Sequence, residues 1–123
     1  MKTRWMPTAG LAMLVLGALI LASGCEDERY SHHPPPGQGS LIVDNATGAR
    51  IDVYIDGALA GDVRDGRDRA WDLRPGVHRI ALRERDYGRY FGGDVDILPD
   101  RRTIAQVSVR PDGAGLQIIF LVD

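Results

Sequence analysis

Beyond residue 40, the chain consists of short runs in which apolar and polar residues alternate, separated by turn-forming residues. No window shows the sustained 3.6-residue periodicity of an amphipathic helix. Turn signals about every 8–12 residues are typical of an all-β fold, and we expect a small antiparallel β-sandwich over residues 41–123. Its strands are expected over residues 41–43, 51–55, 59–63, 70–73, 77–85, 95–98, 103–109 and 116–122.

Two of the expected turns carry a specific signal. Asp56-Gly57 separates two alternating runs and predicts a two-residue β-hairpin turn. Arg74-Pro75-Gly76 also predicts a turn, because proline presets φ and glycine accepts positive φ. Each turn joins neighbouring strands, so the pattern favours antiparallel pairing.

The last expected strand is apolar on both faces. One face carries Leu116, Ile118, Phe120 and Val122, and the other carries Ile119 and Leu121. A sandwich strand normally has one face in water, so a second apolar face needs a cover. We therefore predict that Ile119 and Leu121 mark a surface for self-association or for a partner.

The start of the chain has the features of an export signal. Lys2 and Arg4 precede an apolar run over residues 9–22, and Ala22-Ser23-Gly24 leads to Cys25. The run has the length of a signal-peptide core, whereas a membrane-spanning helix needs about 20 apolar residues. We expect residues 1–24 to be a signal peptide.

Ala22-Ser23-Gly24-Cys25 resembles the lipobox that ends the signal of bacterial lipoproteins, with Ala22 where leucine is usual. The resemblance implies that Cys25 is lipidated and becomes the new N-terminus; an ordinary secretory signal followed by a chance cysteine is the alternative. Cys25 is the only cysteine, so it cannot form an intrachain disulfide. Because Glu26 rather than aspartate follows it, the family pattern favours the periplasmic side of the outer membrane. The periplasmic face of the inner membrane or the cell surface are alternatives.

Residues 25–40 begin with Cys25 and lead to the expected domain. They contain few apolar side chains, the run Pro34-Pro35-Pro36 and two glycines before Ser40. Such a composition cannot bury a core, so we expect a disordered, proline-rich linker between the anchor and the domain.

The charge pattern argues against a nucleic-acid partner. The net charge is −2, and removing Lys2 and Arg4 with the signal lowers it to −4. Nucleic-acid binding needs clustered basic residues, whereas the arginines here are interleaved with aspartates. The length corresponds to one domain.

We predict no catalytic, cofactor or metal site. His32-His33 are adjacent and point apart, no carboxylate is placed near His78 by the sequence, and arginines interrupt the acidic segment 62–68. Asp94 and Asp96 alternate with the core positions Val95 and Ile97, so we expect both to face water.

An aromatic segment over residues 87–93 is the remaining candidate surface. Tyr87, Tyr90 and Phe91 lie among glycines, and we expect a loop that either contacts a partner or glycan or folds over one end of the sandwich. Trp71 shares its strand face with Leu73 and is expected to pack in the core.

Residues 40–98 resemble the PEGA domain. The resemblance rests on Thr47-Gly48-Ala49, on the hairpin at residues 53–57, on Gly61 and on the Leu73–Ile80 block with its Pro-Gly-x-His motif. The proline and glutamate that begin the family pattern are replaced by Ala46 and Thr47. The resemblance implies an extracytoplasmic β-sandwich that mediates envelope contacts and catalyses no reaction.

We therefore expect a non-enzymatic, lipid-anchored envelope module that contacts a protein or cell-wall partner. The alternative is a small carbohydrate-binding or hydrolytic lipoprotein that uses residues 87–93.

Overall fold

The computed structural model describes residues 29–123. The chain divides into two compact units, residues 1–31 and 32–123. Only residues 29–31 of the first unit are described, and they contain no strand; the Arg29 guanidinium carbon lies 5.4 Å from the Tyr30 ring centroid. The expected signal peptide and Cys25 lie outside the described residues.

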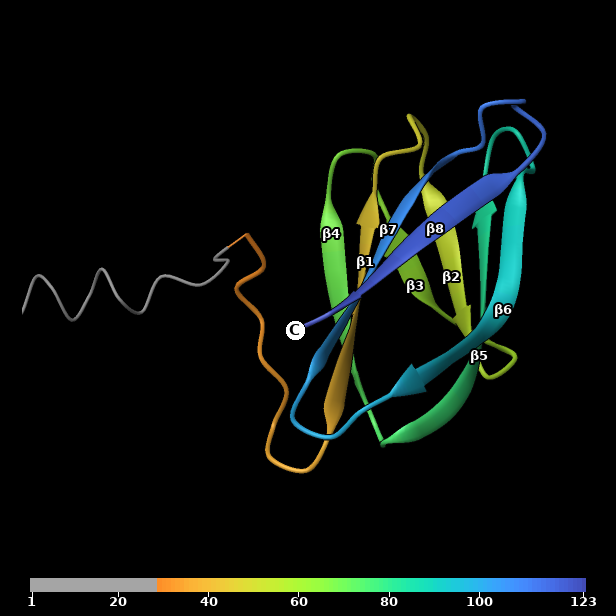
Figure 1. The fold of residues 1–123 in the computed structure, drawn as a ribbon. Coiled ribbons are helices and arrows are strands. Elements are labelled where there is room, and N and C mark those ends of the chain that lie inside the picture. The colour runs from red at the N-terminus through yellow and green to blue at the C-terminus, as the bar shows by residue number, and fades with distance from the viewer. Residues whose placement is uncertain (1–28) are drawn as a thin grey trace, which may run out of the picture. The chain divides into compact units, whose positions relative to one another are not determined.

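The second unit is a sandwich of two four-stranded sheets (Figure 1). Sheet A has the order β4-β1-β7-β8 and sheet B the order β3-β2-β5-β6. The strands are β1 (Gly39–Asn45), β2 (Ile51–Ile55), β3 (Ala58–Val63), β4 (Asp68–Leu73), β5 (Gly76–Glu84), β6 (Tyr90–Ile97), β7 (Arg102–Val109) and β8 (Leu116–Val122). The predicted all-β fold is confirmed.

One strand pairing departs from the expected antiparallel arrangement. β1 and β7 are parallel, with Leu41 opposite Thr103, whereas the other five pairings within residues 29–123 are antiparallel. A parallel pair requires a long crossover, here supplied by all of sheet B together with β4. Alternation within a strand does not report the direction of its neighbour, so this pairing could not be predicted.

The core lies between the sheets. Eight inward residues of β1, β2, β5 and β7 are at most 1% exposed: Leu41, Val43, Ile51, Val53, Ile80, Leu82, Ala105 and Val107. The predicted alternation in residues 51–55 is confirmed, because Asp52 and Tyr54 are more exposed than their neighbours. Trp71 packs against the edge of this core, as expected, and its Nε1 donates to the Ala60 carbonyl at 3.3 Å.

The hairpin between β2 and β3 has the predicted two-residue turn. Asp56 and Gly57 have φ values of 52° and 87°, and Ile55 lies opposite Ala58. Positive φ at both positions is the geometry of a type I′ turn, which matches the right-handed twist of the strands.

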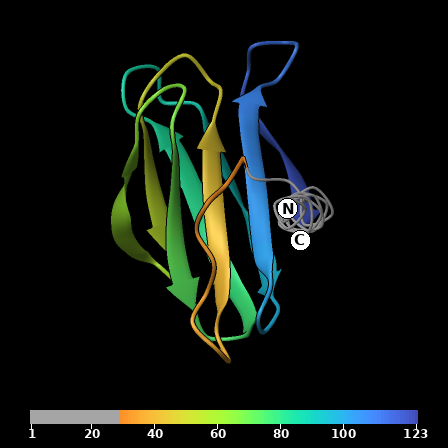
Figure 2. The ribbon, with the colours of Figure 1, turned by 90° about the vertical axis from the view of Figure 1, so that its left-hand side faces the viewer.

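Residues 32–38 differ from the expected disordered linker. They run alongside β1 on the outer side of sheet A (Figure 2), and β1 itself begins at Gly39. His32 Nε2 lies 2.7 Å from Asp72 Oδ1, and the Asp100 amide donates to the Gln38 carbonyl at 2.7 Å. The three prolines restrict the unfolded segment, so ordering it costs less conformational entropy.

Candidate functional site

Strand β8 forms one edge of sheet A and exposes apolar side chains. Ile119 is 58% exposed and Leu121 is 43% exposed, on the outer face beside Gln106 and Ile104 of β7. Val122 is 52% exposed at the end of the strand. The structure thus leaves the predicted association surface uncovered among the described residues, and its association stays a prediction.

The other three edge strands of the described sandwich carry features that hinder addition of a strand. β4 contains Asp68, Arg69 and Asp72, and β6 contains two aspartates. β3 contains Asp62 and a register shift opposite Val53 and Tyr54. By contrast, β8 has no charged residue between Leu116 and Val122. Its outward backbone edge is the one most suited to pairing with another chain.

The expected aromatic loop over residues 87–93 is shorter in the structure. β6 begins at Tyr90, so the loop ends at Arg89. Tyr87 and Tyr90 are each 69% exposed. Of the two alternatives expected for this segment, Phe91 follows the second, because it packs against the core rather than lying on a partner surface. Its position opposite Leu82, an inward residue of β5, is the physical reason.

A buried ion pair holds this loop in place. Glu84 is fully buried and receives hydrogen bonds from Nε and Nη2 of Arg89, the second at 3.1 Å. The hydrogen bond to Glu84 raises the pKa of Arg89. Sequence reasoning missed this pair, although Glu84 continues the inward series Ile80 and Leu82, and a carboxylate at such a position needs a cationic partner.

His78 joins two turns that lie far apart in the sequence. Its Nδ1 lies 2.6 Å from Asp56 Oδ2 and its Nε2 lies 2.7 Å from the Arg74 carbonyl oxygen. Both partners are acceptors, so only the doubly protonated ring satisfies them together. These hydrogen bonds raise the pKa of His78, and those from His78 and the Arg79 amide lower the pKa of Asp56. We call this arrangement the His78 clamp.

The clamp engages both nitrogens of the His78 ring. The expectation that no carboxylate accompanies His78 was wrong, because the Asp56 hairpin reaches it from 22 residues away. Both ring nitrogens are occupied by acceptors of the chain itself, which leaves no nitrogen directed toward a substrate. A histidine that acts as a base needs such a nitrogen within hydrogen-bonding reach of the reacting group.

Within the acidic segment 62–68, Asp62 is paired with arginines. Asp62 Oδ2 lies 3.4 Å from Arg50 Nη1 and 3.5 Å from Arg85 Nη2, and Asp65 accepts a hydrogen bond from the Gly48 amide. Residues 29–123 hold no group of three or more histidine, cysteine or carboxylate side chains arranged for a metal ion. In the same range there is no helix of the length and hydropathy needed to cross a membrane.

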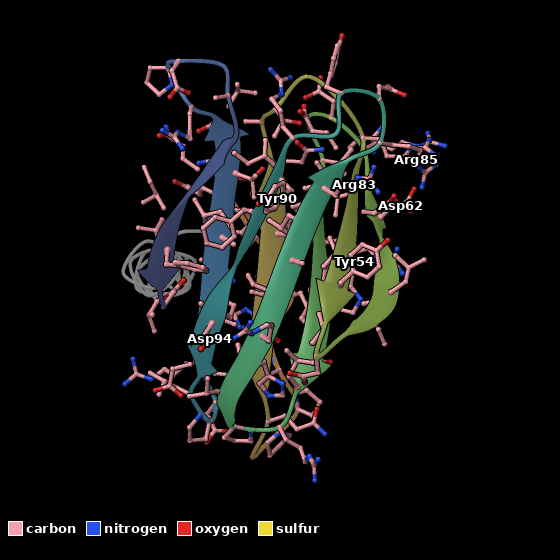
Figure 3. All side chains as sticks on the ribbon, turned by 90° about the vertical axis from the view of Figure 1, so that its right-hand side faces the viewer. Tyr54, Asp62, Arg83, Arg85, Tyr90 and Asp94 are labelled. Atoms are coloured by element: carbon pink, nitrogen blue, oxygen red, sulfur yellow. The ribbon has the colours of Figure 1, made fainter. Side chains whose placement is uncertain are left out.

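A depression of about 600 Å³ lies on the outer face of sheet B. It is lined by Tyr54, Asp56, Gly57, Arg79 and Ala81. In Figure 3 the labelled side chains of Tyr54, Arg83 and Asp94 project from this face, with Tyr90 at its upper part. Asp94 faces water, as expected, and its Oδ1 accepts a hydrogen bond from Arg79 Nε at 3.1 Å.

Comparison with known proteins identifies the fold. No family model and no curated protein matches the chain. Among solved structures, the C-terminal domain of AlgF from P. aeruginosa has a TM-score of 0.55 and 13% identity, over 71% of this chain and 99% of that one. A protein from Eubacterium rectale has a TM-score of 0.53 and 11% identity, over 78% and 93%. The N-terminal domain of AlgF has a TM-score of 0.49 and 21% identity, over 70% and 95%.

Proposed function

We propose that this chain is a non-enzymatic, lipid-anchored module of the bacterial envelope that binds a protein partner through edge strand β8. The observation that carries the proposal is the exposed edge itself. Ile119 and Leu121 lie on one face of an unprotected strand, and three of the four sandwich edges carry charges that β8 lacks. A partner strand added there would gain main-chain hydrogen bonds and cover the apolar side chains.

The anchor is proposed from the sequence. Ala22-Ser23-Gly24-Cys25 resembles a lipobox, and the following Glu26 favours the periplasmic side of the outer membrane. Two or more acyl chains on one residue attach a protein stably, because each buried methylene contributes about 0.8 kcal/mol. The resemblance to the PEGA domain is part of the same proposal, because an extracytoplasmic β-sandwich suits a module that is held at a membrane.

The anchor is tested with Cys25→Ser. We expect the native chain to sediment with membranes and the variant to be released into the soluble fraction. A thiol-free variant that still sediments after high-salt and carbonate washes would overturn lipid attachment through Cys25. Mass spectrometry of the native N-terminal peptide identifies the acyl groups directly.

The β8 interface is tested by placing a photocrosslinking amino acid at position 119 in the intact cell. We expect a discrete protein adduct from position 119 and none from position 59, where Leu59 is 62% exposed on β3. Ile119→Lys should abolish co-purification of that protein, whereas Leu59→Lys should preserve it. Equal adducts from both positions, or co-purification that survives Ile119→Lys, would overturn the β8 interface.

A further inference from the structure

Two residues that line the depression on sheet B, Tyr54 and Ala81, belong to a row of three that crosses neighbouring strands. Tyr54 of β2 lies opposite Ala81 of β5, and Ala81 lies opposite Gly92 of β6. Along this row the outward side chains become smaller: Tyr54 has a phenol ring, Ala81 a methyl group and Gly92 only a hydrogen atom. A Cβ built at Gly92 meets nothing within 4 Å, so the surface above Gly92, two strands from Tyr54, is open.

Polar groups lie around this part of the sheet. On one side, Arg79 Nε donates to Asp94 Oδ1 at 3.1 Å, and Asp56 is held by the His78 clamp. On the other side, Arg83 lies opposite Asp52 and Tyr90. Guanidinium and carboxylate groups are planar and can exchange paired hydrogen bonds with neighbouring hydroxyl groups. An aromatic ring beside small side chains, with such groups at the rim, matches a ligand that has apolar faces and a hydroxylated edge.

Two features of this face argue against a partner strand and against a polyanion as its ligand. β2 and β5 are internal strands whose backbone groups are already paired on both sides, so no partner strand can be added here. The rim mixes Arg79 and Arg83 with Asp52, Asp56 and Asp94, and this balance does not favour a polyanion. The volume of about 600 Å³ lies within the ordinary range for small-molecule sites.

We infer that the outer face of sheet B binds a neutral saccharide, with Tyr54 as the platform on which a sugar ring stacks. The C–H face of a pyranose packs on the phenol ring, and Arg79 and Asp94 meet its hydroxyl groups. This site is separate from β8 and from the exposed Tyr87. It does not depend on the proposed protein interface, because the two surfaces belong to different sheets.

The test is titration calorimetry of the full chain, purified from membranes in detergent, with two neutral probes: cellotetraose and the tetrasaccharide of N-acetylglucosamine. We expect the native chain to bind at least one probe. Tyr54→Ala should weaken binding at least tenfold, whereas Tyr54→Phe, which keeps the ring, should stay within about threefold. Ala81→Lys fills the depression and should weaken binding to a similar extent without removing the ring.

Two matched variants locate the ligand. Tyr87→Ala removes an exposed tyrosine away from the depression, and Ile119→Lys changes β8 on the other sheet. Both should bind the probe as the native chain does. The inference is overturned if the native chain binds neither probe, if binding survives both Tyr54→Ala and Ala81→Lys, or if Ile119→Lys abolishes it. Failure of the β8 crosslink alone would leave saccharide binding intact, so the two proposals fail separately.

Discussion

Asn45, at the end of β1, should contribute more to the free energy of unfolding than an asparagine in an ordinary turn does. Its side chain is fully buried, and the side-chain amide makes two hydrogen bonds through Nδ2 and two through Oδ1. Nδ2 donates to the carbonyls of Ala49 at 2.8 Å and Val63 at 2.9 Å, and Oδ1 accepts from the amide and hydroxyl of Thr47 at 2.9 and 2.7 Å. One side chain therefore joins the 46–50 turn to the end of β3.

Asn45→Ala removes all four of these hydrogen bonds and deprives the buried Thr47 amide of its acceptor. Each intramolecular hydrogen bond contributes about 0.5–1.5 kcal/mol net, and a buried group left without a partner costs more. We expect a loss of about 3 kcal/mol in the free energy of unfolding. For a domain of this size each 1 kcal/mol lowers Tm by about 4–8 °C, so Tm should fall by roughly 12–24 °C.

Asn45→Asp tests the hydrogen bonds without changing the shape of the side chain. It keeps the acceptor for Thr47 but turns a carboxylate oxygen toward the Ala49 and Val63 carbonyls, which repel it. We expect this variant to be at least as unstable as Asn45→Ala at pH 7. Relative to the native chain at each pH, it should recover part of its stability in acid, where the protonated carboxyl can donate.

The assay is thermal unfolding followed by the near-ultraviolet circular dichroism of Trp71. Ala46→Ser, at an exposed neighbouring position, is the control and should change stability by less than about 0.5 kcal/mol. A Tm for Asn45→Ala within about 3 °C of the native value would refute the network argument. So would an Asp variant with native stability at pH 7.

Two further predictions concern the turns and the first strand. The His78 clamp should stabilise the fold most between about pH 4 and 6.5. Because the pKa of His78 is raised in the folded state, its contribution to stability is complete below pH 6.5 and is lost as the pH rises through the folded-state pKa. Because the pKa of Asp56 is lowered, its contribution to stability is complete above pH 3.8 and is lost in acid. The Tm difference between the native chain and His78→Gln should therefore peak in that window, and a difference that is flat from pH 3 to 9 would contradict it. Gly39→Ala should cost about 1–3 kcal/mol, because a Cβ there collides with the Leu98 carbonyl oxygen and meets Ile97 Cγ2 at 2.5 Å, whereas Gly92→Ala has open space and should unfold at the native temperature.

Several parts of the fold were predictable because they depend on short windows of sequence. The alternation at residues 51–55 identified the buried face of β2, and Asp56-Gly57 identified the hairpin turn. The aspartates at 94 and 96 were correctly placed in water by the same alternation. Each of these inferences needs only a period of two residues or the backbone preference of one dipeptide.

The errors fall where a residue's partner is brought to it by a turn or by strand pairing rather than by its own strand. Glu84 looked like part of an ordinary strand until the turn brought Arg89 onto it, and His78 looked isolated until the hairpin brought Asp56 to 2.6 Å. Phe91 was expected in a loop with two alternative roles, and only its pairing with β5 places it opposite Leu82, a register that no local pattern reports.

By itself, the sequence determined the approximate positions of the strands, the Asp56-Gly57 turn and the buried face of β2, and it predicted that Ile119 and Leu121 would need a cover. These are properties of local periodicity and backbone preference. Only the tertiary structure decided that β8 is an edge, that β1 and β7 run parallel, and that Tyr54, Ala81 and Gly92 form one row. Strand order and register set these relations, because side chains tens of residues apart become neighbours only when the two sheets are assembled.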